Sequence, residues 1–232
     1  VENGGRALIM VDPPLQSRKT PISENAALLK LLAGWGVTAK RNLVLSMGLD
    51  ALAGLGSEVA LSSSYTTHPI VRDMRGARVA FPLTRSLESK PTDKTSVENI
   101  ALTSKTSIAV TKLGGELSDS DLTAGVTEAH ALAAAGSYRR STPADEGRFV
   151  VAGTSEFAAN YALRYIGNRD LFLNMINWLA SDEDLISIRP KDPEDRRIEM
   201  TRSQALLLKT TSQFIIPLCI ILAGIFVWWR RR

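Results

Sequence analysis

Residues 210–229 read TTSQFIIPLCIILAGIFVWW, and Arg230, Arg231 and Arg232 follow them. These twenty residues carry no charge, and an α-helix of that length measures about 30 Å, the thickness of the hydrocarbon layer of a bilayer. Tryptophans followed by arginines are typical of the boundary between membrane and water. A buried core helix is the alternative, but such helices rarely run this long. The stretch therefore predicts a membrane-spanning helix with a basic tail.

The charge balance supports this division of the chain. There are 28 Lys and Arg against 24 Asp and Glu, a formal net charge of +4, and without the three terminal arginines the balance is 25 to 24. No stripe of basic residues is interleaved with aromatic ones, which argues against nucleic acid as a partner. About 200 residues remain for a folded domain, enough for one well-buried core.

The sequence predicts three parts. Residues 1–180 form a folded domain, residues 181–204 a charged stalk in which twelve of 24 residues are charged, and residues 205–232 the spanning helix with its tail. The balance of signs in the stalk is typical of a solvated segment with local ion pairs. Because the chain begins without a methionine and enters a strand directly after Gly5, it is expected to be the C-terminal piece of something longer.

Apolar runs within the domain indicate an α/β fold. Residues 7–11 (ALIMV) read as a buried strand, a helix opened by Ser23 is stopped by Gly34 and Gly36, and residues 37–46 return as a strand. This β-α-β pattern predicts a parallel pair with a right-handed crossover. Further strands are expected over residues 58–61, 78–83, 100–103 and 107–111, and a deeply packed helix, apolar on nearly all sides, over 170–180. The apolar runs 130–135 and 148–152 predict an antiparallel hairpin, with a helix as the alternative for the alanine run.

Two residues follow predicted strands at positions where ligands often bind. Asp12 follows the first strand, and ligand contacts are common at such edges of open α/β sheets, although a loop-capping aspartate is the alternative. Ser155 stands two residues after Gly153 at a strand-to-helix turn. Gly-x-Ser at such a turn resembles a nucleophile elbow, but Phe157 replaces its closing glycine. A cap on the following helix, from Thr154 or Ser155, is the favoured interpretation.

The sequence predicts no metal site and no cofactor. The single cysteine, Cys219, lies in the apolar stretch, and His68 has no nearby His, Cys or paired carboxylate. Pro69 places His68 in an extended or turn segment, where a hydrogen bond from its ring to the backbone is expected. No Gly-x-x-x-x-Gly-Lys-Ser/Thr loop occurs, so the chain is not itself an ATPase of that type.

Ala223 and Gly224 form a patch of small residues in the apolar stretch. Helices in a membrane associate through such patches, so these two residues are predicted to pack against a partner helix. The alternative is that Gly224 only adjusts the bending of its own helix.

Several pieces of the chain, in order, carry a family likeness. They are GRALIMVDPP (residues 5–14), HPI (68–70), FPLTRSL (81–87), GNRDLFLN (167–174), NWLA (177–180), DLISIRPK (184–191) and PEDRR (193–197). With them the chain resembles the GldG-like auxiliary component of bacterial ABC transporters, a family associated with gliding motility. The closing third matches best, and residues 48–64 and 101–127 match least.

This resemblance implies a Rossmann-like three-layer α/β domain, related to class I glutamine amidotransferases and to intraflagellar-transport proteins, and it implies an upstream half of the protein. It implies a non-catalytic auxiliary subunit whose partners are an ABC permease and a separate ATPase, with the domain outside the cytoplasm and the helix in the bacterial inner membrane. Arg85, in the FPLTRSL piece, joins Asp12, His68 and Ser155 as a candidate contact for a ligand or partner. A membrane-tethered hydrolase or amidotransferase-like enzyme, using Ser155 or Asp12 with His68, is the alternative, and a homo-oligomer remains open.

Overall fold

The computed structural model describes residues 1–16, 24–47, 56–74, 76–115, 117–139, 146–165, 167–180, 207 and 209–231. It comprises two units, Val1–Ile186 and Ser187–Arg232, and each is described by itself. The first unit is a β-rich domain, and the described part of the second is a C-terminal helical segment.

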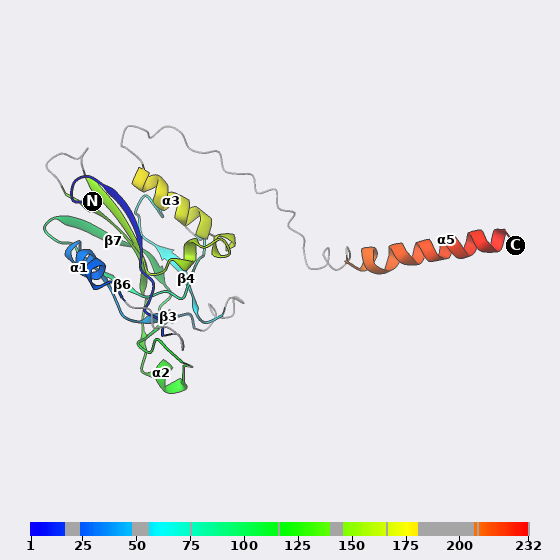
Figure 1. The fold of residues 1–232 in the computed structure, drawn as a ribbon, viewed down its shortest axis with the longest axis horizontal. Coiled ribbons are helices and arrows are strands. Elements are labelled where there is room, and N and C mark those ends of the chain that lie inside the picture. The colour runs from blue at the N-terminus through cyan, green and yellow to red at the C-terminus, as the bar shows by residue number, and fades with distance from the viewer. Residues whose placement is uncertain are drawn as a thin grey trace. The chain divides into compact units, whose positions relative to one another are not determined.

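Strands dominate the domain (Figure 1). They are β1 (Arg6–Met10), β2 (Val37–Ala39), β3 (Leu43–Leu45), β4 (Val59–Tyr65), β5 (Val79–Pro82), β6 (Leu87–Ser89), β7 (Thr95–Thr103), β8 (Ile108–Val110), β9 (Val126–Thr127), β10 (Ala131–Tyr138) and β11 (Gly147–Ala152). The helices are α1 (Ala26–Gly34), α2 (Asp119–Thr123) and α3 (Asn168–Ala180), with 3₁₀ turns η3 (Glu156–Ala158) and η4 (Ala162–Arg164).

Eight of these strands form the main sheet, in the order β1-β11-β10-β7-β4-β5, with β6 on β10 and β2 on β6. Among the described strands of this sheet, only β1 and β11 pair in parallel, and every other pair is antiparallel. A smaller sheet, β3-β8-β9, lies beside α2. The predicted Rossmann-like three-layer α/β fold is therefore wrong, because such a fold needs a sheet of mostly parallel strands.

The error lies in the predicted β-α-β unit. The strand expected over residues 37–46 is two short strands in different sheets, since β2 pairs with β6 and β3 pairs with β8. β1 finds its parallel partner in β11 instead, near the end of the domain. The predicted antiparallel hairpin is confirmed as β10 and β11, with Ala135 opposite Val150.

One helix covers each face of the main sheet (Figure 1). Successive side chains of β11 point to opposite faces, so Phe149 and Val151 pack with α1 while Val150 and Ala152 pack with α3. The Trp35 ring, just past α1, lies 5.1 Å from that of Phe149, centroid to centroid. Both layers therefore meet on β11, the strand that carries the candidate site at its end.

The helix boundaries agree with the local signals at several points. α1 ends at Gly34 as predicted, and Gly36 takes a φ of 88°, a left-handed conformation that suits glycine. The N-cap is Asn25, whose side chain accepts from the Leu28 N–H, while the predicted cap Ser23 lies outside the described residues. α3 is not apolar all round, because Leu171, Met175 and Leu179 are buried on one face and Leu173 and Ile176 are exposed.

The C-terminal segment consists of a π-helical turn, η6 (Thr211–Ile215), and α5 (Ile216–Arg230). Pro217 lacks an N–H and lies in the first turn of α5, where that loss is tolerated. Fifteen residues of α-helix measure about 22 Å, short of the roughly 30 Å of a bilayer core. In the part of the chain that the structure describes, no helix has the length and apolar character needed to cross a membrane.

The predicted membrane-spanning helix over residues 205–232 is therefore wrong, and so is the inner-membrane location deduced from it. Twenty uncharged residues were read as one regular α-helix, whereas Thr211–Ile215 form a π-helical turn ahead of α5. The predicted stalk, residues 181–204, lies outside the described residues.

Candidate functional site

Asp12 and Ser155 meet at one edge of the main sheet. They follow the carboxyl ends of β1 and β11, and because these strands run in parallel, the two residues lie side by side. The Ser155 N–H donates to Asp12 Oδ1 at 2.5 Å, and the Ser155 hydroxyl donates to Asp12 Oδ2 at 2.8 Å. One carboxylate thus holds both the backbone and the side chain of the serine.

Ser155 is not a helix cap. The segment after it forms the 3₁₀ turns η3 and η4 rather than one α-helix, and the Ser155 side chain makes no cap bond. Thr154 takes a capping role instead, since its hydroxyl accepts from the Glu156 N–H at 3.1 Å. Phe157 is buried, whereas Tyr161 is exposed.

Arg85 lies beside this pair and is almost wholly buried, with 1% of its surface exposed. Its Nε donates to the Lys40 carbonyl at 2.6 Å and its Nη2 to Glu24 Oε1 at 2.7 Å. Further bonds of 3.3 Å run from Nη1 to the Asp12 carbonyl and from Nη2 to the Ala39 carbonyl. A buried guanidinium is tolerated when it is paired and hydrogen-bonded in this way.

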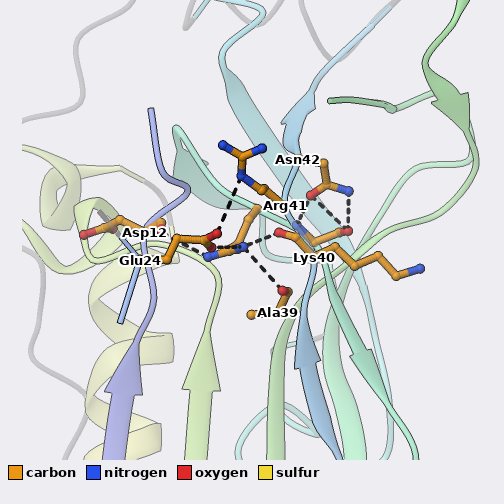
Figure 2. A network of polar contacts seen from close by, with 8 residues as sticks. Asp12, Glu24, Ala39, Lys40, Arg41 and Asn42 are labelled. Atoms are coloured by element: carbon orange, nitrogen blue, oxygen red, sulfur yellow. Dashed lines mark hydrogen bonds and ion pairs between the residues drawn. The ribbon is translucent and has the colours of Figure 1, made fainter. Parts of the chain in front are cut away.

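Figure 2 shows how segments far apart in the sequence meet around this guanidinium. Glu24 also lies 3.6 Å from the Nε of Arg41, whose side chain is 62% exposed. Asn42 follows Arg41 in the chain, and its side-chain amide donates to the Ser86 hydroxyl at 2.8 Å and accepts from the Ser86 N–H at 3.0 Å. These bonds tie the segment before α1 and the segment after β2 to the loop between β5 and β6.

A small cavity of about 180 Å³ opens beside the network. Its polar wall holds Asp12, Glu24, Asn25 and Arg85, and the apolar residues Met10, Val11, Pro14, Leu28 and Leu29 form the rest. A larger hollow of about 460 Å³ lies near Trp35 and Tyr138, and none of the predicted site residues lines it. We regard the smaller cavity as the candidate site because it alone of the two contains a buried charge.

His68 belongs to a different region. Its Nδ1 accepts from the Ile70 N–H at 3.3 Å, which confirms the predicted backbone contact, and its ring packs edge-on against Trp178 at 4.9 Å. The same Trp178 ring carries the Arg148 guanidinium, 5.3 Å from its centroid. Arg148 lies at the start of β11 whereas Ser155 follows its end, so His68 and Ser155 are at opposite ends of the strand. Burial lowers the pKa of His68.

Within the described residues, no hydrogen bond joins His68 or His130 to Ser155 or Asp12. His130 is buried elsewhere, with Nε2 3.0 Å from the Val126 carbonyl oxygen. No three His, Cys, Asp or Glu residues of the described ranges gather closely enough to hold a metal ion.

Three of the four predicted contacts, Asp12, Arg85 and Ser155, come together, and His68 does not join them. Sequence reasoning missed Glu24 and Asn42, which complete the network. No local signal marks either residue, because each acts through a partner more than forty residues away. Ala223 and Gly224 lie in α5, and since no described atom lies within 4 Å of a Cβ placed on Gly224, their packing role stays a prediction.

Comparison with known proteins bears on the fold. No family model and no curated protein matches the sequence. The chain is similar in fold to a solved structure described as "mmIFT52 N-terminal domain". The TM-score is 0.54 and the identity 15%, over 78% of this chain and 67% of that one. At this identity the likeness concerns the fold alone.

Proposed function

We propose that this chain is a non-catalytic auxiliary subunit of an ABC-type transporter complex, in which the β-rich domain binds protein partners beside a permease and a separate ATPase. The ordered residue pieces shared with the GldG-like family support this assignment. The geometry at Ser155 is the structural observation that favours a binding role over a hydrolytic one.

A serine nucleophile needs a base for its proton and N–H donors for the oxyanion that forms on attack. At Ser155 the hydroxyl already donates to Asp12, and the Ser155 N–H donates to the same carboxylate. A carboxylate at that position would repel a developing oxyanion. His68, the base that the enzyme alternative requires, lies at the other end of β11.

Arg85 supports the same conclusion. All of its described contacts are to groups of the domain itself, so it stabilises the loops around the cavity. A rigid domain edge held by such a network is suited to presenting a surface to another protein. The cavity, at about 180 Å³, is smaller than the roughly 300–1,000 Å³ of sites for drug-sized ligands.

The proposal is tested by purifying the tagged full chain from its own cells in mild detergent and identifying the bound proteins by mass spectrometry. We expect an ABC permease and an ATPase, in stable ratio to the chain. Purification without either protein, under conditions that preserve a known ABC complex of the same cells, would overturn the proposal.

Ser155→Ala separates binding from catalysis. Removing one exposed hydrogen bond should cost about 1 kcal/mol of folding free energy and leave the bound partners unchanged. Thr154→Val is the matched control, because it removes a neighbouring hydroxyl that does not touch Asp12. A hydrolase activity lost in the Ser155 variant alone, at unchanged stability, would instead establish the enzyme alternative.

A further inference from the structure

The main path of the sheet ends in β1 on one side and in β5 on the other, and β2 is a further edge that pairs with β6. The ends at β1 and β5 differ. At β5, the buried Asn168 side chain acts like a neighbouring strand. Its Oδ1 accepts from the Ala80 N–H at 2.8 Å, and its Nδ2 donates to the Ala80 carbonyl at 2.7 Å. This end of the sheet is therefore closed by a side chain.

The end at β1 has no such closure in the described part of the chain. Arg148 N–H donates to the Gly5 carbonyl and Val11 N–H to the Ala152 carbonyl, so odd-numbered residues of this segment direct their backbone groups toward β11. Even-numbered residues then direct theirs away. The N–H and C=O of Leu8 and Met10 face outward, and among the described residues no strand pairs with them.

The side chains of β1 are also only half covered. Residues 7–10 are apolar and all partly exposed, whereas residues 149–152 of the paired β11 are fully buried. Leu8 and Met10 continue the layer under α3, and Ala7 and Ile9 continue the layer under α1. Both apolar layers therefore run to this edge, where the described residues cover them only in part.

Natural sheets protect such edges with proline, inward-pointing charges or bulges. Apart from Arg6 at its first position, β1 contains none of these, and the register between β1 and β11 is unbroken. An apolar edge strand with free backbone groups is a template for another strand. The contrast with the closed β5 edge indicates that the β1 edge is kept for pairing.

We propose that β1 pairs antiparallel with β1 of a second copy of this chain, with Leu8 opposite Leu8 of the copy on the two-fold axis. This register pairs all five residues of β1, and it brings the outward-facing backbone N–H and C=O groups of the two copies together. It sets Ala7 against Ile9, and it places the basic Arg6 end beside the Asp12 end of the copy. The face that carries Leu8 is thus apolar in its centre and complementary in charge at its rim, and the face of Ala7 and Ile9 is apolar throughout.

Amide hydrogen exchange of the full chain tests the pairing directly. The Leu8 N–H should become protected as the protein concentration rises, with exchange slowing on the order of tenfold or more. The Ile9 N–H, which faces β11, should exchange slowly at every concentration. Leu8 exchange that stays fast while the chain associates would place the contact elsewhere and overturn the proposal, as would a chain that remains monomeric at high concentration.

Cross-linking gives a second test. Opposite residues of a hydrogen-bonded antiparallel pair lie about 5.5 Å apart between Cα atoms, within the range of a disulfide. In a Cys219→Ser background, which removes the only cysteine of the chain, Leu8→Cys should form a covalent dimer on mild oxidation. Ala7→Cys, on the other face and out of register with its own copy, should not. Equal dimer yields from the two variants, or none from Leu8→Cys, would refute the pairing.

Discussion

Arg85→Met isolates the contribution of the buried guanidinium. The side chain is 1% exposed, and its four described hydrogen bonds end on three carbonyls and on the Glu24 carboxylate. Each carbonyl bond contributes about 1 kcal/mol, and the bond to a carboxylate about 1.5–3 kcal/mol. Methionine fills much of the same volume, so the loss is mainly polar.

The variant recovers part of the free energy that is lost with these four hydrogen bonds. Glu24 is 24% exposed and can turn toward water, and methionine avoids the cost of burying a charge. We therefore expect Arg85→Met to lower the free energy of unfolding by about 3 kcal/mol, in line with the breaking of a buried ion pair. For a domain of this size that corresponds to a fall in Tm of roughly 6–12 °C.

Arg41→Met is the matched control. Arg41 faces the same Glu24 at 3.6 Å, but its side chain is 62% exposed, so its loss should cost no more than about 0.5 kcal/mol. Equilibrium urea denaturation followed by circular dichroism measures both variants. Double-mutant cycles with Glu24→Gln should give a clear coupling energy for Arg85 and almost none for Arg41. Equal losses from the two arginine variants would refute the network.

Three further perturbations have defined outcomes. Asn168→Ala leaves the N–H and C=O of Ala80 without their partner, and urea denaturation should show a loss of about 2–4 kcal/mol; a loss below 1 kcal/mol would mean that the β5 edge needs no closure. Gly153→Ala places a Cβ against the Arg85 carbonyl oxygen, so Tm should fall by several degrees. Gly34→Ala is the control, because a Cβ at Gly34 meets open space, and its Tm should change little. Because burial lowers the pKa of His68 below its ordinary value of 6.5, the folded state binds this proton less readily than the unfolded chain. Its contribution to stability is therefore present above pH 6.5 and is lost as the pH falls below it; NMR titration of the ring checks the direction, and a pKa above 6.5 would contradict it.

Local sequence signals were sufficient for the elements that depend on near neighbours. Gly34 and Gly36 ended α1 where expected, and the paired apolar runs predicted the β10–β11 hairpin with its antiparallel sense. These features follow from backbone preferences and from turns that span few residues. The short helix α2, held by a capping box of Ser118 and Asp121, was not predicted, because its five residues are too few for a periodic signal.

The sheet order could not be predicted in this way. β1 is an apolar run that suits a parallel or an antiparallel neighbour equally well, and its partner β11 lies some 140 residues along the chain. Only the packing of α1 and α3 on opposite faces selects that pairing. In the same way, twenty uncharged residues at the C-terminus satisfy a length criterion, but the structure interrupts the α-helix with a π-helical turn over Thr211–Ile215.

The same distinction between local sequence signals and tertiary packing applies to the candidate site. By itself the sequence determined that Asp12 and Ser155 follow strands, and its family likeness drew attention to Arg85. Only the tertiary structure decided that Ser155 donates two hydrogen bonds to the Asp12 carboxylate and that Glu24 pairs with Arg85. It also decided that His68 lies at the far end of β11. The physical reason is that a hydrogen bond depends on separation in space, which the parallel pairing of β1 and β11 sets and which sequence spacing does not report.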